Sequence, residues 1–158
     1  MIKPLPYSSD PVIVSLDMCD HNKHMNVNYY YRMFDDSYTS MYIEELDFTP
    51  EYIASGFSTF TLEDSIRYLK EFRLGDKVYP SFHLNNVNNK LLHFVGILLN
   101  DENELAAIFE TVLGHIDLNA RKVTDFKEQR LQKLLSYMDS NTIDNDFPFD
   151  LKLKIKDL

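Results

Sequence analysis

The feature that most constrains this chain is a series of strand patterns spaced as hairpins, which follows one long helical pattern. Apolar residues alternate over residues 60–68, and β-rich runs follow at 78–84, 91–99 and 105–116. The polar turns between the later runs, at 85–89 and 100–103, are short enough to join antiparallel neighbours. One helical pattern followed by strands joined as hairpins predicts an α+β fold, in which a long antiparallel sheet packs on a helix.

The helical pattern covers residues 29–46 and carries one apolar stripe. Seven side chains recur at three- and four-residue spacing: Tyr30, Met33, Phe34, Ser37, Tyr38, Met41 and Tyr42. Asn28 is the expected N-cap, because its side-chain oxygen can accept from a free helical N–H group. A short helix is predicted to begin at Thr49-Pro50 and to end at Gly56.

The remaining elements are shorter or lie near the ends of the chain. A first strand is predicted at 12–16 and a C-terminal helix at 124–139. In the strand at 60–68, we expect the apolar side chains Phe60, Leu62, Ile66 and Tyr68 to share one face. Residues 1–140 then form one domain, and residues 141–158 form a tail that is either an edge strand or a mobile end.

Composition excludes several classes of protein. The net charge of −9 argues against nucleic-acid binding, which depends on a basic surface. No apolar run approaches the roughly 18 residues of a membrane span, so no membrane partner is expected. The chain has one cysteine, Cys19, and cannot form an intrachain disulfide. This fits a reducing compartment and predicts a cytoplasmic location.

Residues 17–30 concentrate the side chains that can carry chemistry. Two carboxylates, two imidazoles and three amides precede the long helix, among them Asp20, His24 and Asn26. A helix N-terminus offers free N–H donors and a partial positive charge, which can stabilise the oxyanion of an acyl-transfer reaction. A nearby carboxylate can attack a carbonyl or deprotonate water. The segment therefore suits thioester or ester hydrolysis.

Two other interpretations of this segment remain open. Polar loops before helices commonly serve only as caps and turns. Cys19, His21 and His24 are potential metal ligands, but no second ligand pair with metal-finger spacing follows them, and we expect no metal.

Three motifs resemble hot-dog thioesterases of the 4-hydroxybenzoyl-CoA thioesterase type. The first runs from Asp20 through His24-Met25-Asn26 to Tyr30 and Arg32–Asp35, and its His-Met-Asn variant looks most like the branch associated with carnitinyl- or betainyl-CoA. The other two, residues 61–71 followed by Gly75-Asp76, and residues 105–117, are similar to that branch's first and last long strands. The resemblance covers roughly residues 12–126.

The resemblance implies a long antiparallel sheet wrapped around the central helix, and a homodimer or dimer of dimers with active sites at the subunit interface. It implies an acyl-CoA substrate, with coenzyme A only as part of that substrate and no other cofactor. By motif position, Asp20 matches the catalytic aspartate, acting as nucleophile or general base, and His24 and Asn26 match the residues beside it. The N–H groups of residues 26–30 match the oxyanion site.

Substrate contacts are predicted at three further residues. Lys23 stands where the family usually has Gly, so a positive φ there costs about 1 kcal/mol or more; its ammonium group either lies near the thioester or a CoA phosphate, or points into solvent. Glu63 is either a site carboxylate or the ion-pair partner of Arg67 or Arg32. Tyr30 is either a substrate contact or part of the core. Six cations near strand ends are candidates for the CoA phosphates or ordinary surface charges: Lys70, Arg73, Lys77, Lys90, Arg121 and Lys122.

The predicted function is hydrolysis of an acyl-CoA thioester with Asp20 at the centre. One alternative is a hot-dog protein that binds an acyl thioester without cleaving it. A second is a hot-dog hydratase or dehydratase, although its usual His- and Asp-containing pattern is not found here.

Overall fold

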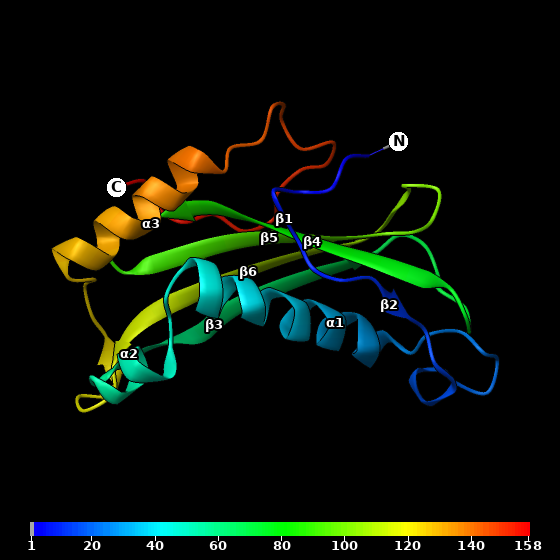
Figure 1. Ribbon diagram of the computed structural model, residues 1–158, viewed down its shortest axis with the longest axis horizontal. Helices are drawn as coiled ribbons and strands as arrows, with labels where there is room; N and C mark the ends of the chain where they lie inside the picture. Colours follow the sequence, from blue (N-terminus) through cyan, green and yellow to red (C-terminus); the bar gives the residue numbers. More distant parts are fainter. Residues whose placement is uncertain (1) are drawn as a thin grey trace.

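The computed structural model describes residues 2–158, and its framework is the antiparallel sheet that the alternating patterns predict (Figure 1). The four long strands are β3 (Phe57–Tyr68), β4 (Lys77–Val87), β5 (Leu91–Leu99) and β6 (Leu105–Asp117). Three two-residue strands complete it: β1 (Tyr7–Ser8), β2 (Val12–Ile13) and β7 (Lys122–Val123). The order is β1-β4-β5-β6-β3, with β2 also on β4 and β7 on β6. The longest edge strand is therefore β3.

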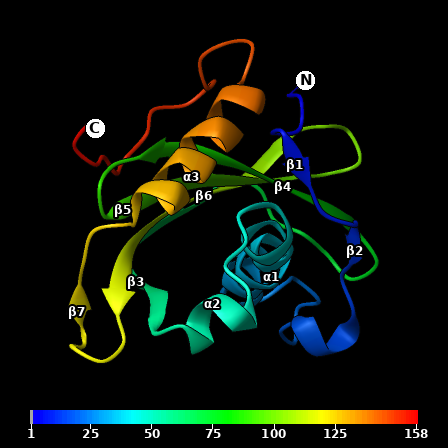
Figure 2. The same ribbon diagram turned by 60° about the vertical axis from the view of Figure 1, so that its left-hand side comes forward.

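The helix α1 (Val27–Ser40) lies along one face of this sheet (Figure 2). Phe34 of α1 stacks on Phe109 of β6 with ring centroids 4.8 Å apart. It also packs over Gly96 of β5, where an added Cβ would stand 2.7 Å from the ring of Phe82. This close approach requires glycine and brings the helix tightly onto the sheet. The predicted α+β hot-dog arrangement is confirmed.

The helix boundaries differ from the predicted ones. Asn26, not Asn28, is the N-cap, and its side-chain oxygen accepts from the N–H of Asn28. After Ser40 the chain continues as one π-helical turn, η2 (Met41–Glu45). The predicted short helix is α2 (Pro50–Ala54), capped by Thr49, and the predicted C-terminal helix is α3 (Glu128–Ser140). The strand predicted at 12–16 is shorter because Leu16–Met18 form a 3₁₀ turn, η1.

A β-bulge in β3 makes one face prediction wrong. The pairing with β6 shifts between Thr61 and Glu63, so that Leu62 is an extra residue. Phe60, opposite Gly114, therefore faces away from α1, whereas Ile66, opposite Phe109, faces the helix. The four apolar side chains do not share a face.

The C-terminal tail forms no strand but is fastened along the side of the sheet away from α1. The backbone N–H groups of Lys152 and Leu153 donate to the buried carboxylate of Glu110, at 2.8 and 3.0 Å. Ile155 is only 4% exposed. The tail is therefore an ordered part of the fold that covers the sheet.

No helix within residues 2–158 has both the length and the apolar character needed to cross a membrane.

Candidate active site

A closed loop between η1 and α1 carries the predicted catalytic residues. Cys19 and Met25 form an isolated antiparallel bridge, and the N–H of Asn26 donates to the carbonyl oxygen of Met18 at 2.9 Å. The N–H of Met25 donates to the carbonyl oxygen of Phe72 at 2.8 Å, which ties the loop to the segment between β3 and β4. The loop is thus held at both ends.

Asp20 lies at the tip of this loop with its carboxylate at the surface. Oδ1 accepts from the backbone N–H of Asn22 at 2.9 Å and, at 3.3 Å, from that of His24. Within residues 2–158 no hydrogen bond engages Oδ2. One oxygen therefore orients the carboxylate, and the other is available to a water or a carbonyl carbon.

Lys23 occupies a left-handed backbone conformation, with φ of 61°. The expected strain is therefore present, because an L-residue other than glycine pays for this region. The turn closes through hydrogen bonds from Lys23 N–H to Asp20 O and from Asp20 N–H to His24 O, each 3.0 Å. Lys23 thus keeps the tight turn of the loop instead of remodelling it.

His24 has a partner that the sequence did not reveal. Its Nδ1 lies 3.1 Å from Oε2 of Glu71, and both side chains are about half exposed. His24 also forms an isolated bridge with Arg73, and the guanidinium of Arg73 pairs with the other carboxylate oxygen of Glu71 at 2.9 Å. The Glu71 carboxylate therefore orients the imidazole of His24.

The start of α1 offers fewer free donors than expected. The N–H groups of Asn26, Asn28 and Tyr29 already have acceptors, namely Met18 O, Asn26 Oδ1 and Asn26 O. Among residues 26–29, only the N–H of Val27, the first residue of α1, lacks an acceptor within residues 2–158. This N–H is the part of the expected oxyanion site that remains open.

Tyr30 is buried, and its hydroxyl is used by the backbone of the neighbouring segment. It donates to the carbonyl oxygen of Lys70 at 3.0 Å and accepts from the N–H of Phe72 at 3.2 Å. Its ring packs edge-on against Tyr68 of β3, with centroids 5.1 Å apart. Tyr30 supports the site from behind, which agrees with the core interpretation of this residue.

Glu63 is not brought to the loop. It lies directly after the bulge, opposite Val112 on the face of the sheet away from α1. The carboxylate that faces the helix is Asp64. Partial burial raises the pKa of Tyr31 and of Asp35 on α1, and the charge of Asp64 adds to this, after that of Asp36 in the case of Asp35. The sequence could not reveal which of these two carboxylates faces the helix, because the bulge reverses the alternation of side chains between the two faces of the sheet.

The six candidate cations divide into two groups. Lys70, Arg73 and Lys90 form ion pairs with Glu104, Glu71 and Asp125. The others, Lys77, Arg121 and Lys122, have no ion-pair partner within residues 2–158.

The described residues contain no cluster of three or more His, Cys, Asp or Glu side chains that could hold a metal ion. Cys19 donates weakly to the carbonyl oxygen of Ser15 at 3.4 Å, and so takes part in the turn instead.

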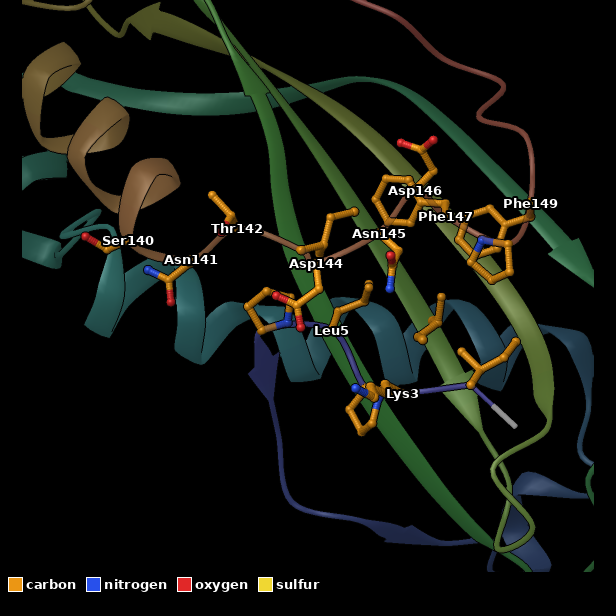
Figure 3. A pocket seen from close by; sticks show the side chains of 16 residues that line it. Lys3, Leu5, Ser140, Asn141, Thr142, Asp144, Asn145, Asp146, Phe147 and Phe149 are labelled. Atoms are coloured by element: carbon orange, nitrogen blue, oxygen red, sulfur yellow. The ribbon is translucent and has the colours of Figure 1, made fainter.

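Two cavities lie away from Asp20. One, of about 290 Å³, opens between α1, α2 and the first half of β3, and is lined by Tyr38, Tyr42 and Thr59 among others. The other, of about 530 Å³, lies on the far side of the sheet between the N-terminal segment and the loop after α3 (Figure 3). Its floor includes Leu5 and Ile97.

The family model of the thioesterase-like superfamily matches residues 14–134, which include the loop, α1 and all four long strands. The chain belongs to this superfamily. The match confirms the resemblance drawn from the three motifs.

Curated relatives support the branch as well. The L-carnitine dehydrogenase/betainyl-CoA thioesterase of Ruegeria pomeroyi is 33% identical over 109 residues, which are 69% of this chain and 22% of the relative. The protein of the same name from a Rhizobium species is 29% identical over 122 residues, 77% of this chain and 24% of the relative. The chain thus spans about a quarter of the length of these relatives.

Solved structures share the fold. A hypothetical protein from Staphylococcus aureus, solved in complex with CoA, superposes with a TM-score of 0.83 at 24% identity, covering 99% of this chain and 98% of the other. A 1,4-dihydroxy-2-naphthoyl-CoA thioesterase from Synechocystis gives 0.72 at 19% identity, covering 84% and 97%.

Proposed function

We propose that this protein hydrolyses an acyl-CoA thioester to a free acid and CoA, with Asp20 as nucleophile or general base. The observation that carries the proposal is the Asp20 carboxylate, oriented through Oδ1 by two backbone N–H groups and open at Oδ2. Membership of the thioesterase-like superfamily supports it. No dissociable cofactor or metal enters the proposal.

The chemistry follows from the loop. Oδ2 of Asp20 either attacks the thioester carbonyl carbon, giving an anhydride that water cleaves, or takes a proton from the attacking water. The oxygen of the carbonyl gains negative charge, which the N–H of Val27 and the N-terminal end of α1 would stabilise. The CoA thiolate then leaves and takes up a proton. Lys23 and His24 would lie beside the reacting group.

The active form is proposed to be a homodimer joined along β3. This strand is a long sheet edge, and an unpaired edge is a template for pairing with another chain. Its side chains include Phe60, Leu62 and Tyr68, which are 40, 51 and 50% exposed. A group of apolar side chains with this much exposed surface is typical of an interface. Pairing of two dimers remains a prediction, as does a cytoplasmic location.

A quaternary ammonium group is the acyl substituent that we favour. The curated relatives carry betainyl-CoA thioesterase in their names. In this chain Asp64 of β3 is close enough to α1 for its charge to act there: partial burial, then Asp36 and then Asp64 raise the pKa of Asp35, and burial followed by Asp64 raises that of Tyr31. Carboxylates and an aromatic ring would suit a cation.

Thiol release over a panel of acyl-CoAs tests the function. We expect turnover by the wild-type protein and a loss of several orders of magnitude in Asp20→Asn, with the dimer intact. Asp17→Asn, which changes a neighbouring carboxylate paired with Ser15, is the matched control and should retain turnover.

Each alternative gives a different result. Tight acyl-CoA binding without thiol release would identify a non-catalytic binding protein. Addition of water to an enoyl-CoA without thiol release would identify a hydratase. Full turnover by a folded Asp20→Asn variant would remove Asp20 from the mechanism.

A further inference from the structure

The cavity on the side of the sheet away from α1 is large enough for a small molecule. Its volume of about 530 Å³ falls within the range of about 300–1,000 Å³ that is common for ligand sites. Ile97 of β5 lies on its floor, and residues 2–6 and 140–149 form its walls (Figure 3). A ligand bound there would lie across the sheet from α1 and the Asp20 loop.

The walls of this cavity come from outside the part of the chain that the family model matches. That match covers residues 14–134, and of the described lining residues only Ile97 falls within it. The cavity is therefore built by the two segments that cover the sheet, and a ligand in it would be distinct from the acyl-CoA proposed at Asp20.

The floor and one wall present apolar side chains that are incompletely covered. Leu5 and Ile97 belong to a second apolar cluster, separate from the core under α1. Ile143, Phe147 and Phe149 pack against this cluster but are only partly buried. An occupant with an apolar body would remove some of this surface from water, which is favourable.

The rim of the cavity carries more negative than positive charge. Asp144 and Asp146 line it, against one cation, Lys3. Within residues 2–158 none of these three side chains forms an ion pair. Asp146 points away from the other lining side chains (Figure 3), so its charge acts from the outer rim. Both carboxylates remain available to attract a cation.

The C-terminal end of α3 adds to this negative potential. Ser140, the last residue of the helix, and its cap Asn141 line the cavity. The C-terminal end of a helix carries a partial negative charge, which cations stabilise. The last turn of α3 contains no basic residue, and Asp139 adds a further negative charge there. The helix end therefore also favours a cation.

Phe147 supplies an aromatic ring for such a cation. It stacks on Phe149 with ring centroids 5.2 Å apart, and Phe149 already carries the guanidinium of Arg67 at 5.6 Å. No cation within residues 2–158 lies over the ring of Phe147. The face of an aromatic ring attracts ammonium groups, and quaternary ones are a common case.

We propose that this cavity binds an organic cation with an apolar body, of the alkylammonium class. The apolar body lies on Leu5 and Ile97, and the ammonium group lies near Asp144, Phe147 and the end of α3. Such a ligand joins residues 2–6 to residues 140–149, and so fastens the two segments that cover the sheet. The proposal does not depend on the proposed thioesterase function.

Three ligands that share a hexyl chain test the class of ligand: hexyltrimethylammonium, hexanol and hexanoate. Calorimetry should give the highest affinity for the cation and the lowest for the anion. Added salt should weaken binding of the cation more than binding of hexanol, because salt screens charges. Equal affinities, or tighter binding of hexanoate, would overturn the cation assignment. Absence of binding by all three would overturn the site.

Two double variants test the carboxylates. Asp144→Asn/Asp146→Asn should weaken binding of hexyltrimethylammonium about three- to tenfold and leave binding of hexanol unchanged. Glu44→Gln/Glu51→Gln removes the same charge from exposed positions on η2 and α2, and should leave both affinities unchanged. Equal weakening by the two double variants would show an effect of net charge alone, against the proposed site.

NMR chemical shifts locate the bound cation. The perturbed backbone amides should belong to residues 2–6, to Ile97 and to residues 140–149. Because the proposed acyl site also suits a quaternary ammonium group, Asp64→Asn is the control for binding there and should leave the affinity unchanged. Shifts confined to α1 and the Asp20 loop, or loss of binding in Asp64→Asn, would refute the cavity as the binding site.

Discussion

Nδ1 of His24 lies 3.1 Å from Oε2 of Glu71, and this contact connects the Asp20 loop to the segment between β3 and β4. A carboxylate that accepts from one ring nitrogen fixes the orientation of the imidazole. We therefore predict that Glu71→Gln lowers kcat about 10- to 100-fold through misplacement of the His24 imidazole. Stopped-flow thiol release measures kcat directly.

Arg73→Gln is the matched control for this prediction. Arg73 pairs with Oε1 of Glu71, so its loss leaves the His24 contact in place. Both pairs are about half exposed, and their loss should change the free energy of unfolding by less than about 1 kcal/mol. If both variants lost kcat equally, the effect would be one of general loop disruption.

Lys23 offers a test of backbone strain. Its φ of 61° is costly for a residue with a Cβ, by about 1–2 kcal/mol, whereas glycine adopts it freely. Glycine also adds disorder to the unfolded chain, which offsets part of the gain. We predict that Lys23→Gly raises the free energy of unfolding by up to about 1 kcal/mol, measured by urea denaturation.

The same substitution one residue earlier should act in the opposite direction. Asn22 has no positive φ, so Asn22→Gly relieves no strain and only adds unfolded-state disorder. A stabilisation by Asn22→Gly equal to that by Lys23→Gly would contradict the strain argument.

The sequence predicted the elements that depend on local pattern. Alternation and polar turns located β4, β5 and β6, and Thr49-Pro50 located α2, because these signals act over a few residues. The position of the Asp20 loop before α1 could also be predicted, since its motif is contiguous.

What the sequence could not predict depends on contacts distant in the chain. The bulge at Leu62 follows from pairing with β6. Because of this bulge, the side chain of Asp64, and not that of Glu63, lies on the helix face of the sheet. Glu71 meets His24 only because the loop folds back onto the next connection. The tail was predicted to be either an edge strand or a mobile end, whereas its N–H groups at residues 152 and 153 donate to the carboxylate of Glu110.

His83 predicts how stability depends on pH. It faces away from α1 under Phe147, and burial, with a smaller contribution from His93, lowers its pKa from 6.5 to about 4. The unfolded chain therefore binds this proton more readily, so the stability from neutral His83 is complete above pH 6.5 and is lost as the pH falls toward 4. The loss amounts to at most about 3 kcal/mol.

Urea denaturation at pH 7 and at pH 4.5 checks this prediction. His83→Gln, which cannot take up the proton, should show a smaller decrease in the free energy of unfolding than the wild-type protein. The free energy of unfolding of His21→Gln, at an exposed position in the Asp20 loop, should decrease as that of the wild type does. Parallel decreases in all three proteins would show that His83 is not responsible.

Glu110 is predicted to be the residue that fastens the tail. Its carboxylate is fully buried and accepts from Lys152 N–H, Leu153 N–H and His93 Nε2. Burial alone would raise the pKa of Glu110, but these hydrogen bonds outweigh it and lower the pKa.

In Glu110→Gln, an NH₂ group replaces one acceptor and leaves a buried N–H unpaired, which should cost about 1–3 kcal/mol. Trypsin should then cleave after Lys152 and Lys154 faster than in the wild type, as mass spectrometry can follow. Glu104→Gln, at an exposed ion pair with Lys70, should leave the cleavage rate unchanged. An unchanged rate in Glu110→Gln would mean that the apolar contacts around Ile155 hold the tail without this carboxylate.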